Sequence, residues 1–95
     1  MKEEASMKLH VLKCWPEFFR ATLAGDKPFE VRENDRNYQV SDWLLLREWE
    51  PGAEEYADRA ILAKVTYVLD DPRFVLPGYV VMGIRWEWEI EGYKP

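Results

Sequence analysis

The strictest pattern in this 95-residue chain is a two-residue alternation near its C-terminus, in the stretch IRWEWEIE at 84–91. Successive side chains of a β-strand point to opposite faces of a sheet, so this alternation is typical of a strand with one apolar face. The strand is expected to begin at Tyr79, directly after the turn residues Pro77 and Gly78. Its apolar face would carry Ile84, Trp86, Trp88 and Ile90.

Four earlier segments also have the composition of strands, and polar turn residues separate them. They are residues 7–14, 28–33, 42–49 and about 59–69. The WLLL run at 43–46 is apolar on both faces, which indicates a strand in the middle of a sheet. Residues 50–58 are acidic and rich in turn formers, so we expect a loop there.

One helix is expected between the first two strands. Pro16 stands where the first turn of a helix tolerates proline, and Gly25 matches a left-handed helix end. The residues Trp15, Phe18, Phe19, Thr22 and Leu23 recur at helical spacing and form one apolar stripe. A helix of roughly two to three turns is not stable alone and must pack on the sheet. The pattern predicts an α+β fold with a short helix packed against a barrel-like sheet of about five strands.

The length of the chain corresponds to one domain, expected over residues 7–95, with residues 1–6 as a leader. No apolar run approaches the roughly 18 residues that cross a bilayer, and the N-terminus lacks the apolar stretch of a signal peptide. We therefore expect a cytoplasmic protein without membrane contact.

Composition restricts the chemistry further. A single cysteine, Cys14, and a single histidine, His10, rule out an internal disulfide and a zinc site built from these residues. We expect no metal and no cofactor. The net charge of −5 argues against non-specific attraction to a nucleic-acid duplex. It still allows recognition of one base or a short strand in a small cationic pocket.

A cluster of charges follows the expected helix. In the strand at 28–33 we expect Phe29 and Val31 to face the core. Glu30 and Arg32 then project together from the other face, and Lys27 lies just before the strand. Such a cluster offers an ammonium, a carboxylate and a guanidinium to one small ligand. The plain alternative is a surface ion pair next to a loop lysine.

Three stretches resemble a known family. Residues 25–32 match the signature G-x-K-x-x-E-x-R of ASCH domains in the PUA-like superfamily, and residues 10–19 match H-x-L-K-x-W-P-x-F-F. Together with GYVVMGI at 78–84, they resemble the small bacterial and phage proteins grouped as DUF3850. The resemblance extends from Met7 to about Trp86.

The resemblance implies a small PUA-like β-barrel with a helix beside it, and a cleft between the two that the signature residues line. ASCH relatives are regarded as RNA-binding or RNA-associated modules. Some look like enzymes, including amidohydrolases that act on acylated cytidine through the signature lysine and a threonine three positions later. In this chain the lysine position is Lys27 and the threonine position is Glu30.

Three hypotheses for the function follow. The first is an RNA-, nucleotide- or modified-nucleobase-binding module, whose ligand contacts are His10, Lys13, Trp15, Lys27, Glu30 and Arg32. The second is a small amidohydrolase or ribonuclease-like enzyme in which Lys27 and Glu30 transfer protons. The third is a phage-type protein-interaction domain, or a homodimer, that uses the strand face with Trp86 and Trp88. For His10 and Trp15 a purely structural role in the core is the alternative. Cys14 could act as a nucleophile only beside an activating base, and we expect a buried structural thiol instead.

Overall fold

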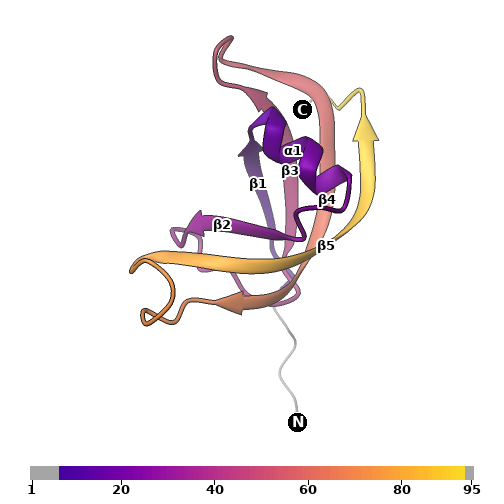
Figure 1. Cartoon of the computed structure of the whole chain (residues 1–95). Helices are drawn as coiled ribbons and strands as arrows, with labels where there is room; N and C mark the ends of the chain where they lie inside the picture. The colour runs from indigo at the N-terminus through magenta and orange to yellow at the C-terminus, as the bar shows by residue number, and fades with distance from the viewer. Residues whose placement is uncertain (1–6, 94–95) are drawn as a thin grey trace.

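A computed structural model describes residues 7–93 of the chain (Figure 1). The expected leader at 1–6 lies outside the described residues. The described part contains helix α1 (Pro16–Leu23) and the strands β1 (Leu9–Cys14), β2 (Phe29–Glu33), β3 (Trp43–Glu50), β4 (Glu55–Leu69) and β5 (Tyr79–Glu91). No helix in residues 7–93 has the length and apolar character needed to span a membrane.

The five strands form one mixed sheet in the order β1-β3-β4-β5-β2. β1 is parallel to β3, and the other neighbours are antiparallel. The long strands β4 and β5 bend strongly, so that the sheet curls into a half-barrel with α1 on its concave side (Figure 1). The result is a small, mostly β version of the expected α+β fold. β1 and β2 form the two ends of the sheet, and the half-barrel is open between them.

The core lies on the concave side of the sheet. Its large, fully buried side chains come from three strands and the helix, and they are Phe19, Leu44, Leu46, Ile61, Val65, Val80 and Met82. The helix begins at Pro16 and is followed by Gly25 with φ of 84°, as the sequence predicts. Only part of its apolar stripe is buried: Phe19 and Thr22 lie inside, whereas Trp15 and Phe18 are about half exposed.

The expected orientation of β2 is wrong. Phe29 and Val31 are 41% and 52% exposed, whereas Glu30 between them is only 3% exposed. The alternation of β2 was correctly recognised, but the buried face is the charged one. A carboxylate tolerates this position because two cations contact it, as described below.

The strand pattern also changes at two bulges. β4 begins at Glu55, about four residues earlier than expected, because Trp49 and Tyr56 still pair across the hairpin after an irregularity in the β3–β4 register. In β5, Trp86 lies opposite Ala63 and Trp88 lies opposite Leu62. Ala63 and Leu62 are consecutive and point to opposite faces, so the two tryptophans also lie on opposite faces. The expected shared Trp86/Trp88 face is therefore wrong.

Candidate ligand-binding cleft

A cavity of about 530 Å³ lies where β1 ends, α1 begins and β2 passes across the opening of the half-barrel. Its lining residues are Lys13, Cys14, Trp15, Phe18, Lys27, Phe29, Glu30, Val31 and Arg32. We call this cavity the cleft. Its volume falls within the roughly 300–1,000 Å³ of small-molecule sites. Of the six expected ligand contacts, the structure brings five together here, and His10 is absent from the lining.

Glu30 is the centre of an ion cluster in the cleft. Its Oε2 accepts a hydrogen bond from Lys27 Nζ at 2.7 Å, and its Oε1 accepts one from Arg32 Nε at 2.9 Å. The Glu30 side chain is only 4% exposed, so these two charge-assisted bonds replace the water that the carboxylate loses. Two cations and one anion leave the cluster with a formal charge of +1.

The same cations also occupy the unpaired edges of the sheet. Pro28 O accepts a hydrogen bond from Ile84 N of β5. Because successive carbonyls of a strand point in opposite directions, Phe29 O points away from β5. Phe29 O accepts a hydrogen bond from Lys27 Nζ at 2.8 Å. On the facing edge of β1, Lys13 O accepts from Arg32 Nη2 at 2.8 Å. Arg32 thus bridges β2 and β1 across the opening where no strand ladder forms. Exposed edge groups of this kind otherwise invite pairing with another chain.

Aromatic rings form the outer walls of the cleft. Trp15 and Phe18 stack with ring centroids 6.5 Å apart and an angle of 20° between their planes. They are 49% and 46% exposed because the buried face of α1 lies at Phe19 and Thr22. Lys27 Nζ lies 5.2 Å from the ring centroid of Phe29. Half-exposed rings beside a cation suit a planar, anionic ligand.

His10 has a different environment. It is 7% exposed, its Nε2 lies 2.8 Å from Asp42 Oδ2, and its ring meets the edge of Tyr38 at 4.8 Å. Asp42 Oδ2 also accepts from Gln39 N at 3.0 Å, so the His10–Asp42 pair joins β1 to the start of β3. Sequence reasoning missed Asp42. The available signal was an acidic residue directly before a strand, in a chain with one histidine.

Lys13 lies at the rim of the cleft. Its Nζ lies 3.9 Å above the ring centroid of Trp49, on the far side of the sheet from α1. The side chain therefore points away from the Glu30 cluster, although its residue lines the cleft.

Cys14 lines the cleft but is 3% exposed, and burial is the largest cause that raises the pKa of its thiol from 9.0 to about 12. Below pH 9 the thiolate population is then about a thousandfold lower than for an ordinary cysteine, since each pKa unit is a factor of ten. We expect iodoacetamide to alkylate Cys14 slowly at pH 8 in the folded protein and rapidly in urea. Mass spectrometry over time measures both rates. Equal rates would contradict the buried thiol.

Comparison with known proteins places these residues in a wider group. The family model described as "Domain of unknown function (DUF3850)" matches residues 9–84, which include all of the cleft. The chain is also similar to a protein of Escherichia phage P2 named "Uncharacterized 12.9 kDa protein in GpA 3'region". That match is 38% identical over 63 residues, and covers 66% of this chain and 56% of the relative. Because the family model covers most of its length, the chain belongs to the DUF3850 family.

Proposed function

We propose that the cleft binds a nucleotide or a modified nucleobase, either free or within single-stranded RNA. The observation that carries the proposal is the position of two cations, Lys27 and Arg32, beside two half-exposed stacked rings, Trp15 and Phe18. A base needs a ring face to stack on, and a phosphate needs N–H donors. The cleft offers both within one cavity.

The cations keep donors for such a ligand. Lys27 uses two of its three N–H groups on Glu30 and Phe29 O, and Arg32 uses two of its five on Glu30 and Lys13 O. Within the described residues, the remaining donors have no protein partner. Glu30 fixes the direction of both cations, so that a phosphate meets a prepared site. The formal charge of +1 on the cluster of Lys27, Glu30 and Arg32 favours a ligand with one anionic group. The positive charge is local, because the whole chain has a net charge of −5.

The same geometry favours binding over the hydrolase hypothesis. A general base must have a free lone pair directed at the substrate proton. Both oxygens of Glu30 accept from protein cations, and Lys27 donates to Glu30 and to a backbone carbonyl. Lys27 and Glu30 are thus both engaged in holding the cleft together, and this favours binding over proton transfer as the proposed activity.

An NMR titration of ¹⁵N-labelled protein tests this proposal. The ligands are plain and modified mononucleotides and a short single-stranded RNA. We expect chemical-shift changes at residues 13–18 and 27–32, and Trp15→Ala is expected to weaken binding about tenfold, since one stacking partner is lost.

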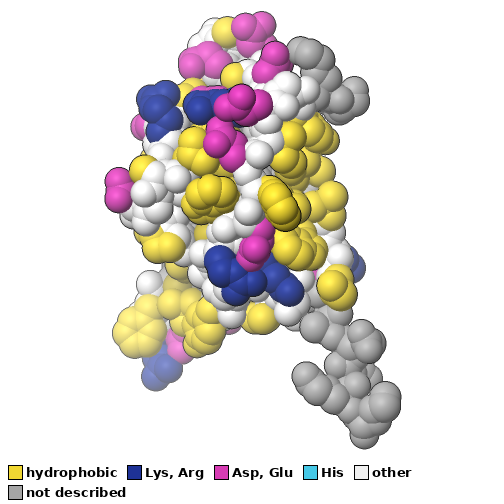
Figure 2. Space-filling view, turned by 90° about the vertical axis from the view of Figure 1, so that its right-hand side faces the viewer, with side chains coloured by type: hydrophobic (Ala, Val, Ile, Leu, Met, Phe, Trp, Pro, Cys, Tyr) yellow, Lys and Arg dark blue, Asp and Glu magenta, His cyan; other side chains and the backbone are white. Residues whose placement is uncertain are grey.

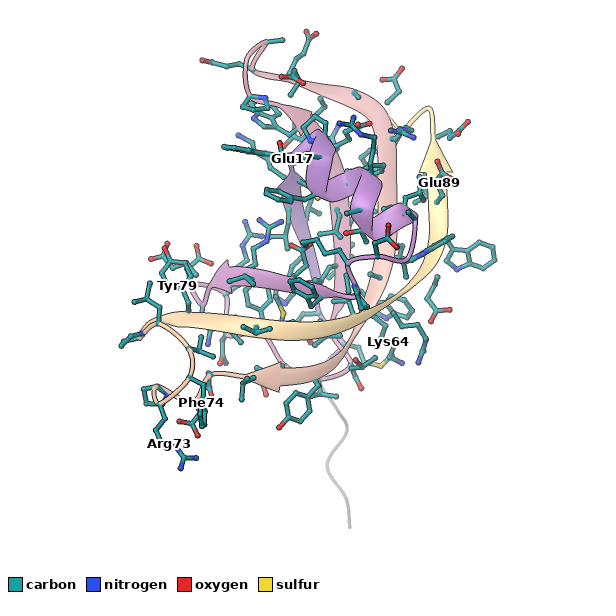
Figure 3. The ribbon with its side chains drawn as sticks, in the orientation of Figure 1. Glu17, Lys64, Arg73, Phe74, Tyr79 and Glu89 are labelled. Atoms are coloured by element: carbon teal, nitrogen blue, oxygen red, sulfur yellow. The ribbon has the colours of Figure 1, made fainter. Side chains whose placement is uncertain are left out.

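The matched control is Arg73→Ala, because Arg73 is an exposed arginine on the loop between β4 and β5, away from α1 (Figure 3). The Arg73→Ala variant should bind the nucleotide with the same affinity as the unchanged protein. Shifts confined to other regions, or the same affinity in Trp15→Ala, would refute the proposal. Following the ligand signals over hours separates binding from turnover: new product signals would replace the binding proposal with an enzymatic one.

A further inference from the structure

The face of the sheet turned away from α1 has an unusual composition. The strand register arranges it as three rows, Leu9–Trp43–Lys64–Arg85, Val11–Leu45–Leu62–Trp88 and Lys13–Arg47–Ala60–Ile90. We call these twelve residues the outer face. The single helix of the described residues, α1, lies on the opposite side of the sheet (Figure 1), so the outer face is covered only by side chains, which bury Leu45, Arg47 and Ala60 at its centre.

All charged residues in the three rows are basic. They are Lys13, Arg47, Lys64 and Arg85, and within residues 7–93 only Arg85 forms an ion pair, with Glu87 of the same strand. The acidic side chains of the neighbouring positions Glu48 and Glu89 lie on the concave side with Arg59. In a chain with a net charge of −5, the three rows thus contain four cations and no carboxylate, and Glu87 beside them pairs with Arg85.

Aromatic rings accompany these cations. Lys64 Nζ lies 5.3 Å from the ring centroid of Trp43, and Lys13 Nζ lies 3.9 Å from that of Trp49. The two pairs are at opposite ends of the outer face, with the apolar middle row between them. The face thus combines flat rings, aliphatic surface and positive charge, which is the composition of platforms that bind single-stranded nucleic acid.

Arg47 contributes charge from below the surface. It is 7% exposed, and its guanidinium carbon lies 3.5 Å from the ring centroid of Tyr56 and 4.8 Å from that of Tyr93. Its Nε is buried and has no hydrogen-bond partner in the described residues, and no ion pair to Arg47 is found there. A buried cation stacked against rings raises the positive potential over the rings that cover it.

The apolar surface of the outer face is open to solvent along β1 and β5, whereas Leu45 and Ala60 between them are 5% and 0% exposed. Trp88 is 66% exposed, Leu9 is 56% exposed and Val11 is 41% exposed. In Figure 2 hydrophobic side chains gather in a band on the right-hand side, and Lys and Arg side chains lie at its lower border. A free tryptophan of this exposure is a stacking surface as well as an apolar one.

Charge decides between the possible occupants. A symmetric dimer through this face would bring Lys13 and Lys64 of one copy close to the same cations of the other, which is unfavourable. A duplex shields its base faces, so it would leave Trp43 and Trp88 without partners. A single strand supplies phosphates for Lys64, Arg85 and Lys13, and unstacked bases for the rings.

We propose that the outer face binds single-stranded nucleic acid. Lys13 belongs to both surfaces, since it lines the cleft and covers Trp49 on the outer face, so one strand can pass from one to the other at this residue. The proposal does not depend on ligand binding in the cleft, because the residues to be changed below lie outside it.

Fluorescence anisotropy with a labelled oligo-uridine RNA of about 12 nucleotides tests the proposal, since single-strand sites span roughly 4–16 nucleotides. Trp88→Ala is expected to weaken binding about tenfold. The double change Lys64→Ala with Arg85→Ala should lower the slope of log affinity against log salt by about 1.4, at roughly 0.7 per phosphate contact. Circular dichroism verifies that each variant is folded.

The controls separate the outer face from the cleft. Arg73→Ala removes an exposed arginine from a loop distant from Lys64 and should leave both the affinity and the salt slope unchanged (Figure 3). Trp15→Ala changes the cleft alone. If RNA binding survives Trp15→Ala but is lost in Trp88→Ala, the result supports the outer face as the binding surface. This holds even if no mononucleotide binds in the cleft. An affinity unaffected by Trp88→Ala and by the double change overturns the proposal. So does self-association through Trp88 without RNA binding.

Discussion

Glu30→Gln is expected to lower the free energy of unfolding by about 2–3 kcal/mol. The change removes the only anion from a buried cluster and leaves Lys27 and Arg32 facing a neutral amide. The effect should fall below the roughly 3–5 kcal/mol of a fully buried pair, because the side chains of Lys27 and Arg32 are 16% and 23% exposed and regain some water. For a domain of this size the melting temperature should drop by about 10–20 °C.

Urea unfolding followed by tryptophan fluorescence measures this change, and Glu33→Gln is its matched control. Glu33 is an exposed carboxylate on the same strand, so its replacement should alter stability by less than about 0.5 kcal/mol.

A second expected effect of Glu30→Gln concerns the opening of the half-barrel. Without Glu30, Arg32 loses the bond that directs it toward Lys13 O, and amide exchange on β1 should become faster. Equal stability of the two variants would mean that Glu30 is not buried between the cations.

Local sequence signals were sufficient for the elements themselves. The helix between Pro16 and Gly25 and all five strands follow from turn residues and alternation, which depend on neighbouring positions only. The order β1-β3-β4-β5-β2 is different, because it places the first and second strands at opposite ends of the sheet. No local pattern contains that information. The finer PUA-like classification stays a prediction from resemblance.

The faces of two strands show why orientation is harder. Alternation separates the two faces of β2 but does not say which one is buried, and hydrophobicity favours Phe29 and Val31. The decisive interactions come from Lys27, before the strand, and from Arg32 at its end, which together permit a buried Glu30. In β5 the alternation is regular in sequence, but the bulge between Trp86 and Trp88 arises from pairing with β4.

The candidate cleft was predictable in part. The spacing of Lys27, Glu30 and Arg32 indicated their common location, which the structure shows. The roles inside the cluster were not predictable, because they depend on which oxygen each cation contacts. No sequence feature near His10 shows whether its side chain lines the cleft or pairs with Asp42. That distinction requires knowing that the start of β3 lies beside β1.

Phe19→Ala is expected to produce the largest loss of stability, about 3–4 kcal/mol. Phe19 is fully buried and joins α1 to the core, where the guanidinium of Arg59 lies 5.0 Å from its ring centroid. The eight-residue helix cannot persist without this contact. Since α1 supplies Phe18 to the cleft and begins directly after Trp15, nucleotide affinity should fall together with helix content. Urea unfolding at low temperature and far-ultraviolet circular dichroism measure the two effects.

The neighbouring residue separates anchoring from ligand contact. Phe18 carries the same side chain on the same helix but is 46% exposed, so Phe18→Ala should cost less than about 1 kcal/mol of stability. It nevertheless removes half of the stacked pair with Trp15, and ligand binding should weaken in a protein that remains folded. Phe19→Leu, which keeps part of the buried volume, should give an intermediate stability. If Phe18→Ala and Phe19→Ala destabilise equally, α1 does not pack through the face seen here, and the cleft walls need a different assignment.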